Sequence, residues 1–197
     1  MSGWLPPGSD LIAGYAMSRR LAYDPKPGED FFRRWEPHDT MVSPELWYNA
    51  CTQPTPWGGH VTIAEPWTAG EACEPLERTL VAFATASWLT RRAAMRVGEP
   101  FLTKVAFLEA PPPPTVTIGE KVWDEHVTTF AASSTEAQRA FPKPVRDLLR
   151  RRGFRGHFEA RPHGFVVHEA GLGPRPEAYD ILFRLSYDIA SALRSAR

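Results

Sequence analysis

Proline constrains the fold of this chain more than any other feature of its sequence. It accounts for 20 of the 197 residues, about twice its average usage in proteins. Each proline removes a backbone donor and fixes φ, so it ends a helix or keeps its residue out of a central strand. Ten prolines lie in the first 75 residues. We therefore expect short elements and long connections there, anchored by large tryptophan side chains.

The composition indicates an ordered globular protein with balanced charge. Hydrophobic residues make up 43% of the chain and aromatic residues 12%, and 23 basic residues match 23 acidic ones. A disordered chain has few aromatic residues and a high net charge, and a protein that binds nucleic acid through bulk charge is basic. No apolar run approaches the roughly 20 residues that span a bilayer. We expect neither nucleic acid nor membrane as a partner.

The cysteines and the N-terminal residues predict a cytoplasmic location. The first residues lack a basic stretch followed by an apolar one, so no secretory signal is expected. Cys51 and Cys73 are too few for a disulfide framework and lack the spacing of metal ligands. We therefore expect two reduced thiols, no metal and no cofactor.

The clearest local pattern is a β-hairpin near the C-terminus. Residues 154–161 and 165–171 both read as strands, and Pro162-His163-Gly164 separates them. If Arg161 faces Gly164, apolar residues fill one face and polar residues the other, which supports that register. The polar face then carries Arg155, His157, Glu159 and His168. We expect this polar face to be exposed to water.

The rest of the C-terminal half predicts a small α+β unit. Strands are expected at 115–119 and 122–133, and a proline-interrupted helical stretch from Thr135 to Arg152 follows. Residues 176–195 carry an apolar stripe at helical spacing. The predicted fold is an antiparallel sheet with helices packed on one face, ending in a β-α-β-β-α module.

The N-terminal half gives weaker signals. Residues 10–24 read as strand or short helix, and Pro44 predicts a short helix through Asn49. Alternation predicts a strand over 60–67, while 76–97 fits helical and strand spacing equally well. Residues 101–110 have strand composition. We divide the chain into a Trp/Pro-rich α+β region, 1–110, and the module at 115–197, which could together form one continuous domain.

The C-terminal half resembles a module that ends many uncharacterised bacterial proteins. The matching parts are residues 118–130, the proline-interrupted helix, the hairpin and the final helix. In 118–130 the group has a glycine and then an aromatic residue followed by aspartate, and here these are Gly119, Trp123 and Asp124. The resemblance covers about 40% of the chain. It implies a bacterial protein and favours strands over a helix for 79–97, and it carries no known activity. Many members of that group have membrane segments, which this chain lacks.

Two groups of residues could carry acid–base chemistry. His157 and His168 sit opposite each other in the preferred register, with Glu159 on the same face, and two imidazoles with a carboxylate could hold a metal or move a proton. Asp124 and His126 would share one face of their expected strand. A carboxylate in this position can orient a histidine for proton transfer. The alternative for both groups is an ordinary polar surface.

A third candidate is a cluster of arginines that could bind an acidic partner. Arg146, Arg150, Arg151 and Arg155 lie in or just after the helix expected to end at Arg152. The alternative is that they form the solvent face of that helix.

From these patterns we expect a non-catalytic protein that acts as an accessory or scaffold subunit. It would bind another protein or itself through the arginine cluster or the Trp-rich half. The alternative is a small enzyme or ligand-binding protein that uses His126, His157, His168 and Glu159.

Overall fold

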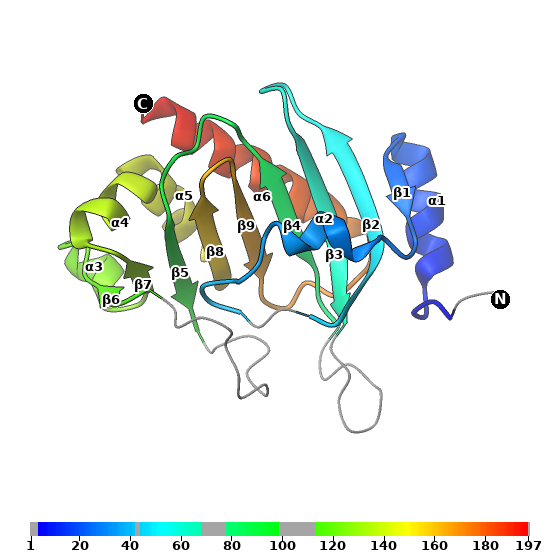
Figure 1. Ribbon diagram of the computed structural model, residues 1–197, viewed down its shortest axis with the longest axis horizontal. Helices are drawn as coiled ribbons and strands as arrows, with labels where there is room; N and C mark the ends of the chain where they lie inside the picture. The colour runs from blue at the N-terminus through cyan, green and yellow to red at the C-terminus, as the bar shows by residue number, and fades with distance from the viewer. Residues whose placement is uncertain (1–3, 42–43, 68–77, 99–112, 197) are drawn as a thin grey trace.

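The computed structural model describes residues 4–41, 44–67, 78–98 and 113–196, and it contains one antiparallel sheet of nine strands (Figure 1). The strands follow the order β1-β2-β3-β4-β9-β8-β5-β7-β6 across the sheet. Their bounds are β1 Ala22–Asp24, β2 Leu46–Pro54, β3 His60–Trp67, β4 Val81–Thr85, β5 Ala93–Val97, β6 Thr115–Val116, β7 Thr128–Ala131, β8 Gly156–Arg161 and β9 Gly164–Glu169. The helices are α1 Ser9–Arg19, α2 Glu29–Arg33, α3 Lys121–Asp124, α4 Ser134–Ala140, α5 Lys143–Arg152 and α6 Pro176–Ser195. The chain is an α+β protein, as its sequence predicted.

Strands from the two halves of the sequence alternate in the sheet. β9 pairs with β4, and β5 lies between β8 and β7. The C-terminal elements follow the order β6-α3-β7-α4-α5-β8-β9-α6 along the chain, and within the sheet β5 from the first half separates β7 from β8. The expected module therefore forms part of a larger sheet and has no separate sheet of its own.

One face of the sheet is covered by α6, which lies behind the strands in Figure 1. Its apolar stripe is buried as predicted, with Tyr179, Leu182 and Ile189 fully covered. They pack against inward-facing strand residues such as Ile63 and Phe158 in the larger of two apolar cores. Burial of this stripe is the main stabilising contribution of the helix, because packing outweighs intrinsic propensity in proteins.

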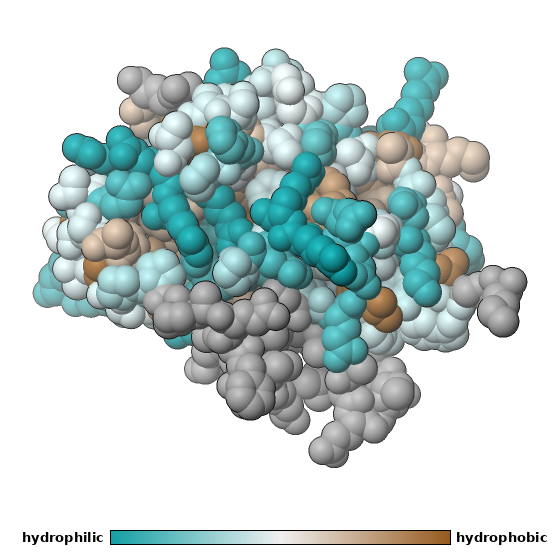
Figure 2. All heavy atoms as spheres, viewed as in Figure 1, coloured by the Kyte–Doolittle hydropathy of each residue, from teal (hydrophilic) through white to brown (hydrophobic). Residues whose placement is uncertain are grey.

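The opposite face is covered by α2 and by residues 34–41, which we call the strap (Figure 1). Phe32 and Trp35 pack there against Trp47 and Phe83 in a second apolar core. The Phe32 and Trp47 rings are stacked with centroids 4.3 Å apart. The outer surface on this side is largely hydrophilic (Figure 2). Both faces of the sheet are thus covered, which the expectation of helices on one face did not foresee.

Several sequence predictions hold at the level of single elements. The hairpin has the preferred register, with Arg161 opposite Gly164. The strand expected at 60–67 is β3, and the ambiguous segment 76–97 contains two strands, β4 and β5, within its described part. The segment 10–24 contains both alternatives, the helix α1 followed by the strand β1.

Two other predictions are wrong. The residues after Pro44 form the strand β2 where a helix was expected. The strand expected over 122–133 begins only at Thr128, because residues 121–124 form the short helix α3. The strand expected at 101–110 lies outside the described residues. Among the described residues, no helix combines the length and the apolar character needed to cross a membrane.

Candidate functional site

The β8–β9 hairpin brings three of the predicted polar residues together. His157 lies directly opposite His168, with ring centroids 5.7 Å apart, and Glu159 follows two residues along the same face. His168 Nε2 lies 2.8 Å from Thr79 Oγ1. The two histidines and the glutamate are at most 4% exposed. The expectation that this face is exposed to water is therefore wrong for these three residues, while Arg155, the fourth residue assigned to that face, is exposed.

The strap is what keeps water from Glu159. Its carboxylate oxygen Oε1 accepts hydrogen bonds from the backbone N–H groups of Asp39 and Thr40, both at 2.9 Å. The Thr40 hydroxyl donates to the same oxygen at 3.0 Å. The His38 ring lies beside the other oxygen, with Nδ1 3.6 Å from Oε2. A buried carboxylate is tolerated when it receives several hydrogen bonds of this kind.

Arg161 fastens the first part of the strap. Its guanidinium lies 3.2 Å from Glu159 Oε2 and donates to the backbone carbonyl oxygens of Trp35 and Pro37. One cation thus neutralises the buried carboxylate and satisfies two strap carbonyls. Because β8 alternates, Arg161 lies on the same face as Glu159 and reaches the strap directly.

Arg92 fastens the last part of the strap from outside the sheet. Its Nη2 and Nε atoms donate to the two carboxylate oxygens of Asp39, at 2.6 and 3.2 Å. The Asp39 side chain is 2% exposed and that of Arg92 is 52% exposed. This two-point geometry suits a guanidinium and a carboxylate. Arg161 therefore holds the first part of the strap, and Arg92 and Glu159 together hold its last part at Asp39 and Thr40.

The buried titratable groups have strongly shifted pKa values. Burial lowers the pKa of His157 to about 4. The negative charge of Glu159 raises this pKa, and the positive charge of Arg96 lowers it further. Burial and the nearby His157 lower the pKa of His168 to about 3. Burial alone would raise the pKa of Glu159, but His38, Arg161 and the Thr40 N–H lower it to about 2. At neutral pH both imidazoles are therefore neutral and the carboxylate is charged.

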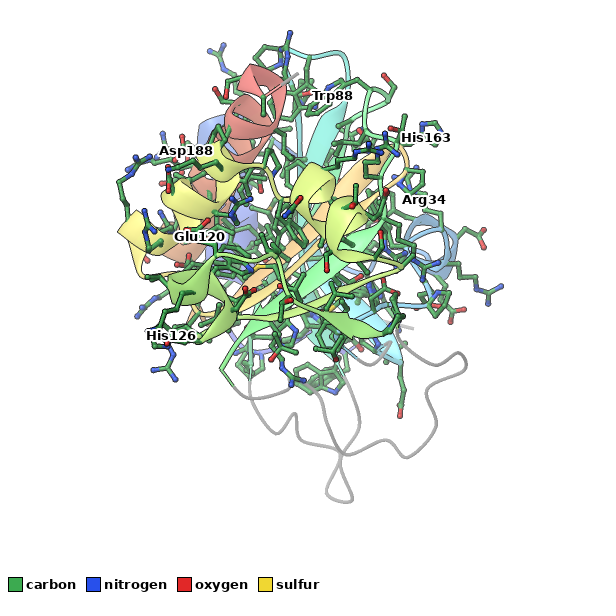
Figure 3. All side chains as sticks on the ribbon, turned by 90° about the vertical axis from the view of Figure 1, so that its left-hand side faces the viewer. Arg34, Trp88, Glu120, His126, His163 and Asp188 are labelled. Carbon is green, nitrogen blue, oxygen red and sulfur yellow. The ribbon has the colours of Figure 1, made fainter. Side chains whose placement is uncertain are left out.

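A hollow of about 350 Å³ lies at the outer side of this network. Its walls come from the strap, β4 and the β8–β9 turn, and they are formed by Arg34, Trp35, Glu36, Pro37, Thr85, Arg92, Arg161, Pro162 and His163. The Arg34 guanidinium lies 4.2 Å from the centre of the Phe31 ring. Figure 3 shows Arg34 and His163 on this side of the molecule. His157, His168 and Glu159 do not line the hollow.

His126 and Asp124 do not join the buried cluster. The Asp124 carboxylate accepts the backbone N–H groups of Ile118 and Gly119, at 2.8 and 2.9 Å, and so shapes the turn before α3. His126 is exposed just after α3, across the molecule from His163 (Figure 3). The expectation that Asp124 and His126 share a face of one strand is wrong, because they lie in a helix and the turn that follows it.

The arginine cluster is partly engaged inside the molecule. Glu120 accepts from Arg146 Nε at 2.9 Å and from Arg150 Nη1 at 3.3 Å, and Arg150 also reaches Asp147. Arg151 and Arg155 are exposed. A docking role for these arginines stays a prediction, and Arg151 and Arg155 are its least engaged members within the described part of the chain.

The sequence did not reveal the partners of Glu159. His38, Asp39 and Thr40 lie about 120 residues before Glu159, and a polar triplet in a proline-rich connection carries no local signal of that contact. From the sequence, Arg161 only sets the register of the hairpin and is not identified as a partner of Glu159. Among the described residues, no group of three or more histidine, cysteine or acidic side chains is placed to hold a metal ion.

Comparison with known proteins gives one informative likeness. No protein-family model and no curated protein matches the chain. Its structure is similar to the crystal structure of the mycobacterial trehalose monomycolate transport factor A, TtfA. The TM-score is 0.63 and the sequence identity 14%, over 98% of each chain. At this identity the likeness shows a shared α+β fold and nothing finer.

Proposed function

We propose that this chain is a non-catalytic accessory protein that binds another protein through the apolar surface around α1. The observation that carries the proposal is the position of its exposed apolar side chains. Six large apolar side chains among the described residues are exposed, and five of them lie within the first 46 residues. We use the name α1 surface for Trp4, Leu5, Leu11 and Met17.

The α1 surface has the properties of a protein-binding surface. Met17 is 80% exposed and Leu11 64% exposed, although α1 also buries Ile12 and Tyr15 on its inner side. Trp4 is 57% exposed yet touches Tyr48 and Trp67 edge-on, at 5.7 and 5.0 Å between ring centroids. Figure 2 shows hydrophobic atoms along the edge of the molecule where α1 lies. Exposed apolar side chains, and tryptophans whose rings are fixed by packing, are typical of protein-binding sites.

The state of the buried polar cluster supports a structural role over a catalytic one. A general acid or base must come within hydrogen-bond reach of a substrate atom. Glu159 is 1% exposed and bound by the strap, and the charge of Arg161 is used on Glu159 and two carbonyl oxygens. These groups therefore hold the strap on the sheet. The likeness to a transport factor, although limited to the fold, agrees with an accessory role.

Site-specific photo-crosslinking tests the proposal. A benzophenone amino acid at Met17, in the last turn of α1, should yield an adduct with a defined protein in cells that express the chain. The matched control carries the same group at Arg184, which is exposed on α6. A second copy of this chain as the captured protein would mean self-association through the same surface. Equal or absent adducts at Met17 and Arg184 would refute the proposal.

The same assay addresses the arginine cluster. Arg151 is exposed, and changing it to glutamate disturbs none of the ion pairs of Glu120. If the partner also contacts this cluster, Arg151→Glu reduces the yield of the Met17 adduct. If the partner binds at α1 alone, the yield is unchanged.

A further inference from the structure

A second hollow lies across the molecule from the strap, between α3 and the C-terminal end of α5. Its volume is about 290 Å³, close to the lower limit of about 300 Å³ for small-molecule pockets. Its apolar walls come from β5, α3, α5 and the segments that follow the two helices, and they are formed by Met95, Val97, Trp123, Val127, Leu149 and Phe154. Figure 3 shows Glu120 and His126, which also line it, on this side.

The largest side chain in the wall of the hollow, Trp123, has no polar group free to bind a ligand. The Trp123 indole N–H already donates to Thr129 Oγ1 at 3.0 Å, and the ring itself is 5% exposed. Val122 places a further apolar side chain, 51% exposed, among the lining residues. The walls therefore suit an apolar body that needs no hydrogen-bond partner.

The polar lining has an excess of positive charge. Three arginines, Arg146, Arg150 and Arg155, line the hollow together with a single carboxylate, Glu120. Glu120 pairs with Arg146 and Arg150, and Arg150 also pairs with Asp147 beside the hollow, so the positive charge left over is that of Arg155. Arg155 is exposed and forms no ion pair with any carboxylate in the described part of the chain. A guanidinium at an apolar pocket favours a carboxylate, phosphate or sulfate group.

We propose that this hollow binds a small amphipathic anion, with its apolar body between α3 and α5 and its anionic group on Arg155. The site is separate from the α1 surface, so the inference goes beyond the proposed function and does not depend on it. Arg155 provides charge recognition, and the apolar walls provide most of the buried contact area.

Titration with octanoate, observed by NMR, tests this site. The Trp123 indole N–H resonance, assigned by its loss in Trp123→Phe, should shift saturably with octanoate. Arg155→Gln should weaken octanoate binding by about tenfold or more, since a charge-assisted contact is lost. Binding of octan-1-ol, which has no charge, should be the same in Arg155→Gln and in the unchanged protein. Arg151→Gln, which removes a nearby charge outside the hollow, should leave octanoate binding unchanged.

A second variant tests the position of the ligand without touching a buried residue. Val122→Asp places a carboxylate beside the hollow at an exposed helix position, so the fold should be retained. It should weaken octanoate binding more than octan-1-ol binding. The inference is overturned if octanoate gives no saturable shift, or if Arg155→Gln and Arg151→Gln weaken it equally. Shifts confined to other tryptophans would also overturn it.

Discussion

Glu159 is the residue on which the strap depends most. It is a buried carboxylate that pairs with Arg161 on its own strand, and its other partners come from a segment about 120 residues away, with three donors from Asp39 and Thr40 on one of its oxygens. Removing one member of a buried charged network costs far more than the pair contributes, because the other charges remain buried. We therefore interpret Glu159 as a residue that stabilises the fold by holding the strap on the sheet.

Glu159→Gln should lower the free energy of unfolding by about 3–5 kcal/mol, the range for breaking a buried ion pair. The amide keeps the shape of the side chain but leaves Arg161 without its counter-charge and turns one acceptor into a donor. Urea unfolding measures the effect. Glu125→Gln, at a side chain 53% exposed, is the control and should change stability by less than about 0.5 kcal/mol. Equal effects of the two substitutions would show that the network is not stabilising.

The buried histidines predict a loss of stability in mild acid. Their folded-state pKa values, about 4 for His157 and about 3 for His168, lie below the usual 6.5. The unfolded chain therefore takes up protons first as the pH falls below about 6.5, and stability decreases. Glu159, with its pKa lowered to about 2 from 4.5, adds a further decrease below about pH 4.5. All three groups act in the same direction.

His168→Gln separates the histidine contribution from the rest. Glutamine can still hydrogen-bond to Thr79 but does not titrate. Between pH 6.5 and 4, the slope of unfolding free energy against pH should decrease by up to roughly 1.4 kcal/mol per pH unit. This corresponds to the loss of one proton taken up on unfolding. Urea titrations at several pH values measure this slope. An unchanged slope would mean that His168 is not held neutral in the folded protein.

At the scale of single elements, the strap is the feature that covers the polar face of the sheet. Arg92 and Arg161 hold its two ends, and α2 leads into it. Trp35 and Met41 of the strap pack in the second apolar core, but its segment from Pro37 to Thr40 is held by hydrogen bonds and ion pairs, in contrast to the apolar contacts of α6. Segments held in this way open at a lower free energy than packed helices do.

Arg92→Ala should increase local opening of the strap. The backbone N–H groups of Asp39 and Thr40 should exchange with deuterium about tenfold faster or more, since the Asp39 charge loses its partner. Hydrogen exchange resolved by NMR is the measurement. Arg91→Ala is the matched control, because Arg91 pairs with Glu136 outside the strap. Unchanged exchange at Asp39 and Thr40 would show that Arg92 does not hold the strap.

The start of β8 requires a glycine. Gly156 has φ of +139°, and a side chain there would overlap the carbonyl oxygen of His168 on β9. Gly156→Ala should therefore lower the free energy of unfolding by more than about 2 kcal/mol. Gly173→Ala is the control, because its nearest contact would be 3.8 Å away. Thermal unfolding of both variants measures the difference, and similar melting temperatures would contradict this account of the hairpin.

Sequence reasoning succeeded where one face of an element is chemically distinct. The hairpin register and α6 followed from apolar residues at fixed spacing. It failed at β2, where Trp47, Tyr48 and Ala50 are all buried and a bulge follows Tyr48, so no period of two is visible. It also failed for the surroundings of Glu159, since only the assembled sheet brings the strap over β8.

At the scale of the whole molecule, both faces of the sheet are closed, one by α6 and its neighbours and the other by α2 and the strap. Strands from the two halves of the sequence are intermixed within the sheet, because β5 of the first half lies between β8 and β7 of the second. Most of the exposed large apolar residues in the described part of the chain lie in or near α1, and the cationic hollow lies beside α3 and α5. The two binding sites that we propose, the α1 surface for a protein and the hollow beside α3 for a small anion, are therefore separate.

The affinity of the crosslinked partner for surface variants tests the central claim most directly. We predict that Met17→Asp weakens binding of the purified partner by about tenfold or more, because an exposed apolar contact is replaced by a charge that must be desolvated. Arg184→Asp on α6 should leave the affinity unchanged. An affinity that is the same for Met17→Asp and the unchanged protein would contradict binding through the α1 surface.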